Sequence, residues 1–298
     1  MTFNKFIFYL SGLSYLLRSG ISRKELPFIG GIAINDRCNL HCRHCFVSNR
    51  NIPDLSYEEI REGLLQLYDK GMKYLYIEGG EPFLWKDNSR DLEDVVQLAR
   101  DIGFRYIVIY TNGTFPVETS ANLVFVSIDG LKDTHDAMRG KCYERIISNI
   151  NRSSHKKIYA NFTITSQNMS EIEEFCEETD KIRNLKGVNF YLYTPYNGKD
   201  ELFLSYEDKR KIIENILSLK KKGYHILNSK TTLKSAYNDS WKRPSGLSYL
   251  YAEKKLYMCC RAIGMDDICE NCGYLGFTEI FHMSRLNPDA LMTAFKYY

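Results

Sequence analysis

Three cysteines, Cys38, Cys42 and Cys45, are the residues of this sequence best suited to chemistry. They are spaced C-x3-C-x2-C and follow directly after the short apolar run 31–34. Three thiolates on one tight loop can ligate three irons of a [4Fe–4S] cube and leave the fourth iron open. An open iron can bind a substrate or a cofactor, so the spacing indicates a reactive cluster rather than one that only transfers electrons.

Zinc is the alternative for this segment. Zinc prefers four Cys or His ligands in a closed tetrahedron, and His41 or His44 could supply the fourth. The cysteine loop by itself leaves both metals open, and the other motifs of the chain favour the cluster.

A second cysteine group lies near the C-terminus and comprises Cys259, Cys260, Cys269 and Cys272. Neighbouring residues point in different directions, so we expect one of Cys259 and Cys260 to be a ligand, together with the C-x2-C pair. A second [4Fe–4S] cluster, a structural zinc and no metal are all compatible with this spacing. Cys142 and Cys176 lie outside both groups, and we expect them to be inert structural thiols.

The elements that must position these residues alternate regularly from residue 30 onward. The predicted strands are 31–35, 73–77, 105–110, 123–128, 158–164 and 188–193. The predicted helices are 57–70, 91–102, 143–153, 170–182 and 205–222, several of them with N-terminal capping boxes such as Ser56 with Glu59 and Ser170 with Glu173. Alternation of this kind predicts an α/β fold with a parallel sheet and right-handed crossovers.

Six strand–helix units are too few for a closed eightfold barrel and fit a partial (β/α)6 barrel of the TIM type. A doubly wound open sheet is the alternative, because periodicity alone does not separate the two. After Gly223 the rhythm stops, and we expect one short strand at 224–227, a hairpin at 249–258 and a tail helix from Pro288. The predicted domains are therefore a 1–29 extension, a 30–223 barrel and a 224–298 cysteine-rich unit.

Polar and glycine-containing motifs follow every predicted strand. In chain order they are the cysteine loop, Glu-Gly-Gly-Glu-Pro at 78–82, Thr-Asn-Gly at 111–113, Ser-Ile-Asp-Gly at 127–130, Thr-Ile-Thr-Ser-Gln-Asn at 163–168 and Tyr-Thr-Pro-Tyr-Asn-Gly at 193–198. In βα barrels chemistry collects on the loops at the C-terminal ends of strands. We therefore expect these motifs to meet at one end of the sheet.

Composition narrows the functional class. The 298 residues are 44% hydrophobic and 26% charged, as in ordinary globular proteins, and the net charge of +3 is too small to predict a nucleic-acid partner. Clustered cysteines in a chain of this length indicate metal ligands in a reducing compartment, so we expect a cytoplasmic protein.

The N-terminal stretch 3–17 is rich in aromatic and aliphatic residues, and Arg18, Arg23 and Lys24 follow it. It lacks a clear cleavage site for a signal peptide. We expect a surface helix that packs on the barrel or lies at a membrane interface, which would place the protein peripherally at the inner face of the membrane.

The C-x3-C-x2-C motif together with Gly-Gly-Glu-Pro resembles the radical S-adenosylmethionine (radical SAM) superfamily. The resemblance implies a partial (β/α)6 barrel, a [4Fe–4S] cluster on Cys38, Cys42 and Cys45, and S-adenosylmethionine as cofactor. It also implies an electron donor of the flavodoxin or ferredoxin type, because the cluster must be reduced.

The resemblance also implies roles in cofactor binding. The residues concerned are Gly79, Gly80, Glu81 and Pro82 for the methionine amino group, Ser127 and Asp129 for the ribose or carboxylate, and Asn112 and Thr165 as weaker candidates. His135-Asp-Ala-Met-Arg-Gly140 resembles an H-D-x-x-R-G stretch of the subgroup with C-terminal cysteines, and implies that Arg139 pairs with a carboxylate. His44 stands where the family usually has an aromatic residue, and it can stack on adenine.

The C-terminal cysteines resemble a shortened auxiliary-cluster extension of the SPASM or twitch type. The two ends of the chain resemble adenosylhopane synthase and its relatives, which act on isoprenoid lipids at membranes. The resemblance therefore predicts a 5′-deoxyadenosyl radical used on an unactivated carbon or alkene of an isoprenoid or lipid, with Tyr193, Tyr196 and Asp129 facing the substrate. The alternatives are a peptide or small-metabolite substrate and, from another class, a zinc-binding scaffold without catalysis.

Overall fold

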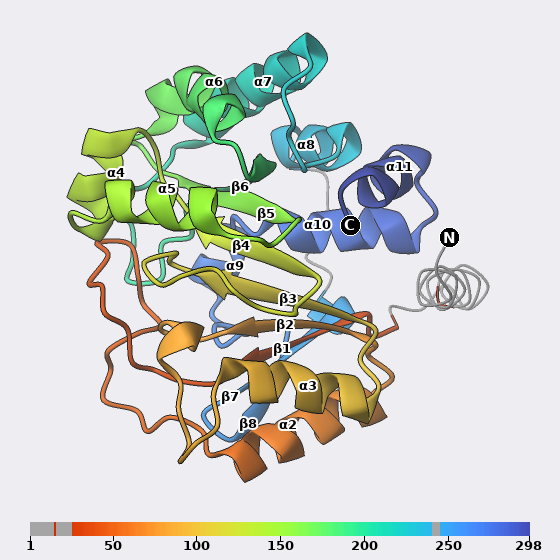
Figure 1. Ribbon diagram of the computed structural model, residues 1–298. Coiled ribbons are helices and arrows are strands. Elements are labelled where there is room, and N and C mark those ends of the chain that lie inside the picture. Colours follow the sequence, from red (N-terminus) through yellow and green to blue (C-terminus); the bar gives the residue numbers. More distant parts are fainter. Residues whose placement is uncertain (1–14, 16–25, 240–244) are drawn as a thin grey trace.

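The computed structural model describes residue 15 and the ranges 26–239 and 245–298 (Figure 1). The helix predicted at 3–17 lies outside these ranges, apart from Tyr15. Within the described part of the chain, every helix is too short or too polar to cross a membrane.

Strands and helices alternate along the chain as the sequence predicts. The strands are β1 (Ile29–Ala33), β2 (Tyr74–Glu78), β3 (Tyr106–Thr111), β4 (Leu123–Ser127), β5 (Ile158–Ile164), β6 (Leu185–Leu192), β7 (Ser248–Ala252) and β8 (Lys255–Met258). The α-helices are α2 (Tyr57–Asp69), α3 (Leu92–Ile102), α4 (Lys132–Arg139), α5 (Tyr143–Arg152), α6 (Ile172–Lys181), α7 (Tyr206–Lys222), α8 (Lys230–Tyr237), α9 (Asp266–Glu270), α10 (Leu275–Ser284) and α11 (Pro288–Tyr297).

The sheet has the strand order β6-β5-β4-β3-β2-β1-β7-β8. All neighbours from β1 to β6 pair in parallel and follow chain order without reversal. A doubly wound sheet changes direction at a switch point, so this order excludes that alternative. The partial barrel is confirmed, with α2 and α3 covering one end of the curved sheet and α5, α6 and α7 the other (Figure 1).

The predicted C-terminal hairpin is present and belongs to the same sheet. β7 pairs antiparallel with β8 and parallel with β1, with Ser248 opposite Ile29. The strand predicted at 224–227 is reduced to a single bridge between Ile226 and Val188. The C-terminal region is thus joined to the barrel by backbone hydrogen bonds along β1.

The capping boxes predicted from the sequence are present at the helix N-termini, with one exception. Ser56 with Glu59 and Ser205 with Asp208 form the predicted capping boxes. The box predicted at Ser170 and Glu173 is wrong, because 169–171 forms a 3-10 turn and α6 starts at Ile172 without a side-chain cap. Asn168 explains the difference, since its amide donates to the carbonyls of Asp129 and Thr163 and ties the turn to the strand ends.

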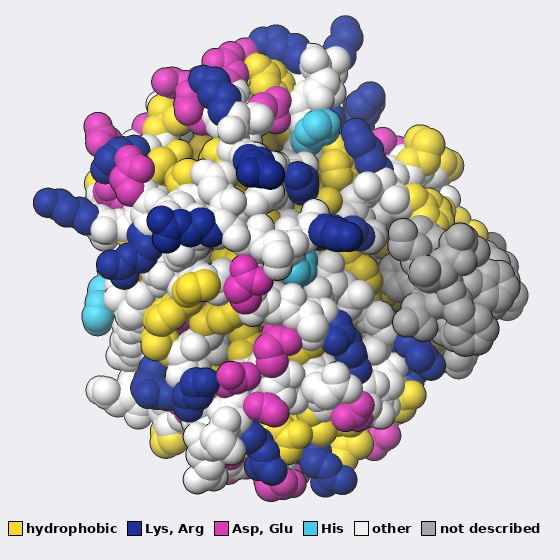
Figure 2. All heavy atoms as spheres, viewed as in Figure 1, with side chains coloured by type: hydrophobic (Ala, Val, Ile, Leu, Met, Phe, Trp, Pro, Cys, Tyr) yellow, Lys and Arg dark blue, Asp and Glu magenta, His cyan; other side chains and the backbone are white. Residues whose placement is uncertain are grey.

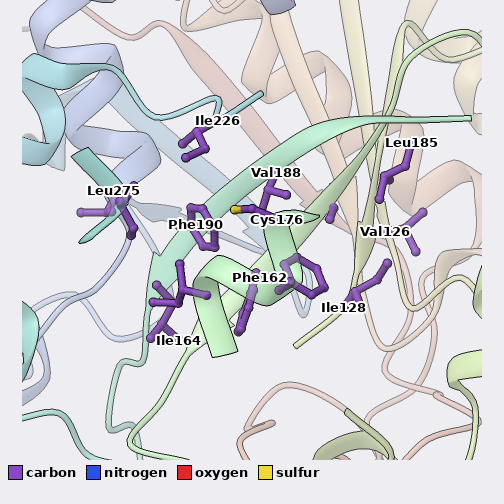
Figure 3. Close-up of a cluster of buried hydrophobic side chains, with 14 of the residues drawn as sticks. Val126, Ile128, Phe162, Ile164, Cys176, Leu185, Val188, Phe190, Ile226 and Leu275 are labelled. Atoms are coloured by element: carbon purple, nitrogen blue, oxygen red, sulfur yellow. The ribbon is translucent and has the colours of Figure 1, made fainter. Parts of the chain in front are cut away.

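Two apolar clusters fill the space between the outer face of the sheet and the helices. Figure 3 shows the cluster around β4, β5 and β6, where Phe162, Phe190 and Val188 surround the thiol of Cys176. Burial raises the pKa of Cys176 to about 12, as expected for an inert structural thiol.

The inner face of the barrel carries many aromatic residues. Side chains alternate along a strand, so Ile107 and Ile109 face the helices while Tyr106 and Tyr110 face inward. Gly31 of β1 leaves room for the ring of Tyr76, whose atoms would lie 2.1 Å from a Cβ at that position. The sheet therefore encloses a chamber with aromatic walls.

Candidate active site

The cysteine loop leaves the C-terminal end of β1 and is closed by two polar side chains. The Asp36 carboxylate accepts hydrogen bonds from the Arg50 amide and guanidinium at 2.6 and 2.9 Å. The Asn49 side chain accepts from the Cys38 amide and donates to the Leu40 carbonyl, both at 2.9 Å. These contacts hold the loop in shape without any help from its cysteines.

Hydrogen-bond donors surround the sulfur atoms of the loop. Cys38 Sγ accepts from the Leu40 amide at 3.4 Å and from Asn112 Nδ2 at 3.6 Å. Arg139 Nη1 lies 3.9 Å from Cys42 Sγ. Burial raises the pKa of Cys42 to about 11, so the free thiol is neutral, and a bound metal ion would be needed to keep it as a thiolate.

Gly79 and Gly80 allow the loop after β2 to pack closely against the start of the cysteine loop. A Cβ at Gly79 would lie 2.2 Å from Asn35 Oδ1, and one at Gly80 would lie 2.3 Å from the Arg37 carbonyl oxygen. The sequence analysis expected the glycines to make room only for a ligand. In the structure they let the β2 loop pass against the start of the cysteine loop, and both also line the cavity described below.

Glu81 is fully buried and faces away from the cavity. Its carboxylate accepts from Thr111 Oγ1 at 2.8 Å and from the amides of Asn112 and Phe83 at 2.7 and 3.1 Å. Burial raises its pKa to about 7, although these donors oppose the shift. In the structure this carboxylate links the β2 loop to the end of β3, and both Glu81 and Pro82 lie outside the cavity lining.

Asp129, Arg139 and His44 form a buried polar group beside Cys42. Arg139 Nε lies 2.5 Å from Asp129 Oδ2, and their side chains are 8% and 1% exposed. Arg139 Nη2 lies 3.4 Å from His44 Nε2. Burial lowers the pKa of His44 to about 4, so at neutral pH Nε2 accepts from Arg139 and the proton is on Nδ1, which has no hydrogen-bond partner in the described ranges.

A second layer holds Asp129 in place. His135 Nδ1 accepts the Asp129 amide at 3.2 Å, and the Cys142 thiol lies 3.4 Å from the other ring nitrogen. The Thr163 amide donates to Asp129 Oδ1 at 2.9 Å. His135 and Arg139 both lie on α4, so this one helix holds Asp129 at its backbone amide and at its carboxylate.

A single cavity of about 490 Å³ runs from the cysteine loop into the barrel. The predicted site residues that line it are Cys38, Cys42, His44, Cys45, Gly79, Gly80, Asn112, Ser127, Arg139, Tyr193, Tyr196 and Cys260. The predicted residues outside its lining are Glu81, Pro82, Asp129, Thr165, Cys259, Cys269 and Cys272. Thr165 is buried in the turn after β5, where its amide donates to Asn168.

The second cysteine group is attached to the end of β6. A Cβ at Gly273 would lie 1.8 Å from the Leu192 carbonyl oxygen, and the Gly273 amide donates to Thr194 Oγ1 at 2.9 Å. Arg261, which follows Cys260, lies 3.3 Å from Glu78 at the end of β2. Both cysteine groups therefore reach the same cavity, the second through Cys260.

Ligand spacing bears on the choice of metal. Four thiolates bound to zinc at 2.3 Å lie only about 3.8 Å apart. Among the residues that the structure describes, three potential ligand atoms lie within 4.8 Å of one another only at His135, Asp136 and Cys142. Within the described residues, neither cysteine group therefore has three sulfur atoms as closely spaced as in a zinc site.

Several residues of the cavity were missed by the sequence analysis. Phe46 stacks on Tyr196, and Glu78 pairs with Arg261 across the cavity wall. Phe46 directly follows the third cysteine, so its position was a usable signal. The sequence did not indicate that Arg261 and Tyr274 line the cavity, because only the attachment of the C-terminal loop to the sheet brings them there.

The radical SAM superfamily model matches residues 32–179. Fe-coproporphyrin III synthase of Methanosarcina barkeri is 30% identical over 207 residues, which cover 62% of this chain and 50% of that protein. Pre-heme d1 synthase of Dinoroseobacter shibae is 32% identical over 180 residues, covering 55% and 42%. The chain thus spans about half the length of these curated relatives.

A solved structure with the same fold is SuiB of Streptococcus suis bound to its precursor peptide SuiA. Its TM-score is 0.64 at 15% identity, and the alignment covers 88% of this chain and 67% of SuiB. The cysteine loop at the end of β1, the barrel behind it and the family match together lead to one conclusion: the chain belongs to the radical SAM superfamily, which uses a [4Fe–4S] cluster and S-adenosylmethionine.

Proposed function

We propose that this protein cleaves S-adenosylmethionine reductively and uses the resulting radical to remove a hydrogen atom from a small-molecule or peptide substrate. The observation that carries the proposal is that Cys38, Cys42 and Cys45 line one cavity together with many aromatic side chains of the barrel. The orphaned Nδ1 of His44 and the donors around Cys38 Sγ fit a bound cofactor at that end.

The residues of the site have separable tasks in this proposal. Cys38, Cys42 and Cys45 would hold the cluster, which when bound and reduced supplies the electron that splits the sulfonium C–S bond of the cofactor. Arg139, fixed by Asp129, places a positive charge beside Cys42. The aromatic walls exclude water from the substrate, which protects a reactive radical from side reactions.

The comparisons favour the peptide or small-metabolite alternative over the lipid substrate. The two curated relatives described above are named as synthases of Fe-coproporphyrin III and pre-heme d1, and the structural neighbour holds a precursor peptide. The lipid expectation depended mainly on the stretch 3–17, which lies outside the described residues. We further propose that Cys260, Cys269 and Cys272 hold a second cluster, because their loop is attached beside the same cavity.

The test is anaerobic incubation with S-adenosylmethionine and a strong reductant, followed by chromatography for 5′-deoxyadenosine and metal analysis of the protein. We expect iron and sulfide in the protein and reductant-dependent 5′-deoxyadenosine. The Cys42→Ala variant should lose this product, whereas Cys176→Ala, which removes a thiol outside both groups, should retain it. Stoichiometric zinc with no cleavage product would instead support a zinc-binding scaffold.

A further inference from the structure

The charged side chains that line the cavity differ in whether they form ion pairs. Four charged side chains line it in the described ranges, namely Glu78, Arg139, Arg261 and Glu279. Arg139 is paired with Asp129, and Arg261 with Glu78. Glu279 is the lining carboxylate for which the described residues provide no ion pair within 4.0 Å.

Glu279 lies on α10, at the end of the cavity formed with the C-terminal helices, where α8, α10 and α11 pack together (Figure 1). It is 8% exposed, and its Oε2 accepts the Ser229 amide at 3.0 Å. Its Oε1 is buried and makes no hydrogen bond of good geometry within the described residues, although the Thr232 and Ser229 hydroxyls lie close enough to lower the pKa of the carboxyl group. Lys220 is a nearby cation, but its ammonium donates to the Ile226 carbonyl at 2.6 Å.

Burial of the Glu279 carboxylate costs free energy, and a ligand that pairs with it could offset this cost. Burial raises the pKa of Glu279, which shows that the surroundings disfavour its charge. A buried carboxylate oxygen that makes no well-formed hydrogen bond is uncommon in folded proteins and calls for a specific explanation. A positively charged ligand would pair with the carboxylate and favour its ionised form.

The walls next to Glu279 suit a cation as well. Tyr191, Phe277 and Tyr298 line this part of the cavity. Burial raises the pKa of Tyr298, and the nearby Tyr191 and Glu279 add to the shift. Gly276 of α10 lets the helix approach Tyr191, whose hydroxyl would lie 2.7 Å from a Cβ there. Aromatic faces around one carboxylate are a common way to bind alkylammonium groups.

The ion pairs of Arg139 and Arg261 make the cavity unsuitable for substrates with several negative charges. Both arginines of the described lining already pair with carboxylates, and no lysine side chain of the described ranges lines the cavity. Several phosphates or carboxylates would therefore meet aromatic rings and Glu279 instead of cations, at the full cost of burying unpaired charge.

We propose that the cavity binds a substrate with a single positively charged nitrogen, held by Glu279 among the tyrosines, and with an apolar body that extends along the inner face of the sheet toward the cysteine loop. This inference rests on the proposed function for its view of the cavity as the substrate site. The ammonium group could belong to a free amine or to a lysine side chain of a peptide, since both present the same chemistry to Glu279.

The test is calorimetric titration of the anaerobically purified full chain with matched probes, without cofactor or reductant. Choline is compared with its neutral isostere 3,3-dimethylbutan-1-ol, and Nα-acetyl-lysine methylamide with its Nζ-acetylated form. We expect at least one charged probe to bind about tenfold tighter than its neutral partner, and Glu279→Gln to remove that difference. Glu58→Gln, the same change at an exposed carboxylate on α2, should preserve it.

Equal binding of charged and neutral probes, or no saturable binding of either charged probe, would overturn the proposal. The wild-type comparison needs no variant, so it decides the question even if Glu279→Gln folds poorly. The preferred charged probe identifies whether a free amine or a peptide side chain is the better fit. Because these titrations involve no radical chemistry, a protein that binds choline but cannot cleave S-adenosylmethionine would refute the proposed function alone.

Discussion

The ion pair between Asp129 and Arg139 offers a sharp test of how the site is built. The two groups lie 2.5 Å apart with side chains 1% and 8% exposed, beside Cys42. The substitution Asp129→Asn keeps the shape and an acceptor for the Thr163 amide, but leaves the guanidinium buried without its counter-charge. Breaking a buried pair by removing one partner costs about 3–5 kcal/mol.

For a chain of this size about 1 kcal/mol lowers the melting temperature by roughly 2 °C, so Asp129→Asn should lower it by roughly 6–10 °C. Arg139 and His44 hold the pKa of Asp129 below its usual range, so the stabilisation is present above the unfolded pKa and is lost only as the pH falls through the folded one. The difference between wild type and variant should therefore be constant from about pH 5 to pH 8.

The assay is differential scanning calorimetry of anaerobically purified protein. The matched control is Glu178→Gln, which removes one partner of the pair between Glu178 and Lys181 on α6, with side chains 43% and 68% exposed. Exposed pairs contribute at most about 1 kcal/mol, so the control should shift by 2 °C or less. If Asp129→Asn lowered the melting temperature no more than this control, the buried pair would not stabilise the site.

Three further predictions concern the loops around the cavity. Replacing both Cys269 and Cys272 by Ala should lower the iron content per chain but leave the iron bound at Cys38, Cys42 and Cys45. An unchanged iron content would contradict a second cluster. Gly80→Ala should reduce iron binding and thermal stability together, because its Cβ would meet the Arg37 carbonyl at 2.3 Å, and a variant with normal iron content would refute that contact. Glu81 has a folded pKa of about 7 against an ordinary 4.5, so wild-type stability should fall by about 3 kcal/mol as the pH rises from below 4.5 to above 7. Glu81→Gln should lack this slope in melting experiments across that range, and parallel pH profiles would show that Glu81 does not titrate.

The surface of the protein agrees with its modest net charge. Figure 2 shows basic and acidic side chains interspersed over one face, without a broad area of a single sign. Exposed apolar side chains occur at Met292 and Phe295 on α11 and at Met265 beside α9.

Local features of the sequence determined the family, the alternation of strands and helices and the cysteine loop. These depend on residues close together in the chain: the C-x3-C-x2-C spacing, the capping boxes, and the change of hydrophobic period from two to 3.6. The placement of the polar motifs at the C-terminal strand ends followed from the same local reading, because parallel strands share one end. Short helices without side-chain caps, such as α4 and α9, carried no comparable signal.

Only the tertiary structure decided which contacts the side chains of the motifs make. Gly80 packs against Arg37, Arg139 turns inward to Asp129, and Arg261 reaches Glu78 from 183 positions away in the chain. It also put Glu279 of α10 and the cysteine loop of β1 at one cavity. Such contacts depend on which strand pairs with which, as in the parallel pairing of β7 with β1, and a spacing pattern contains no information about partners so distant in the chain.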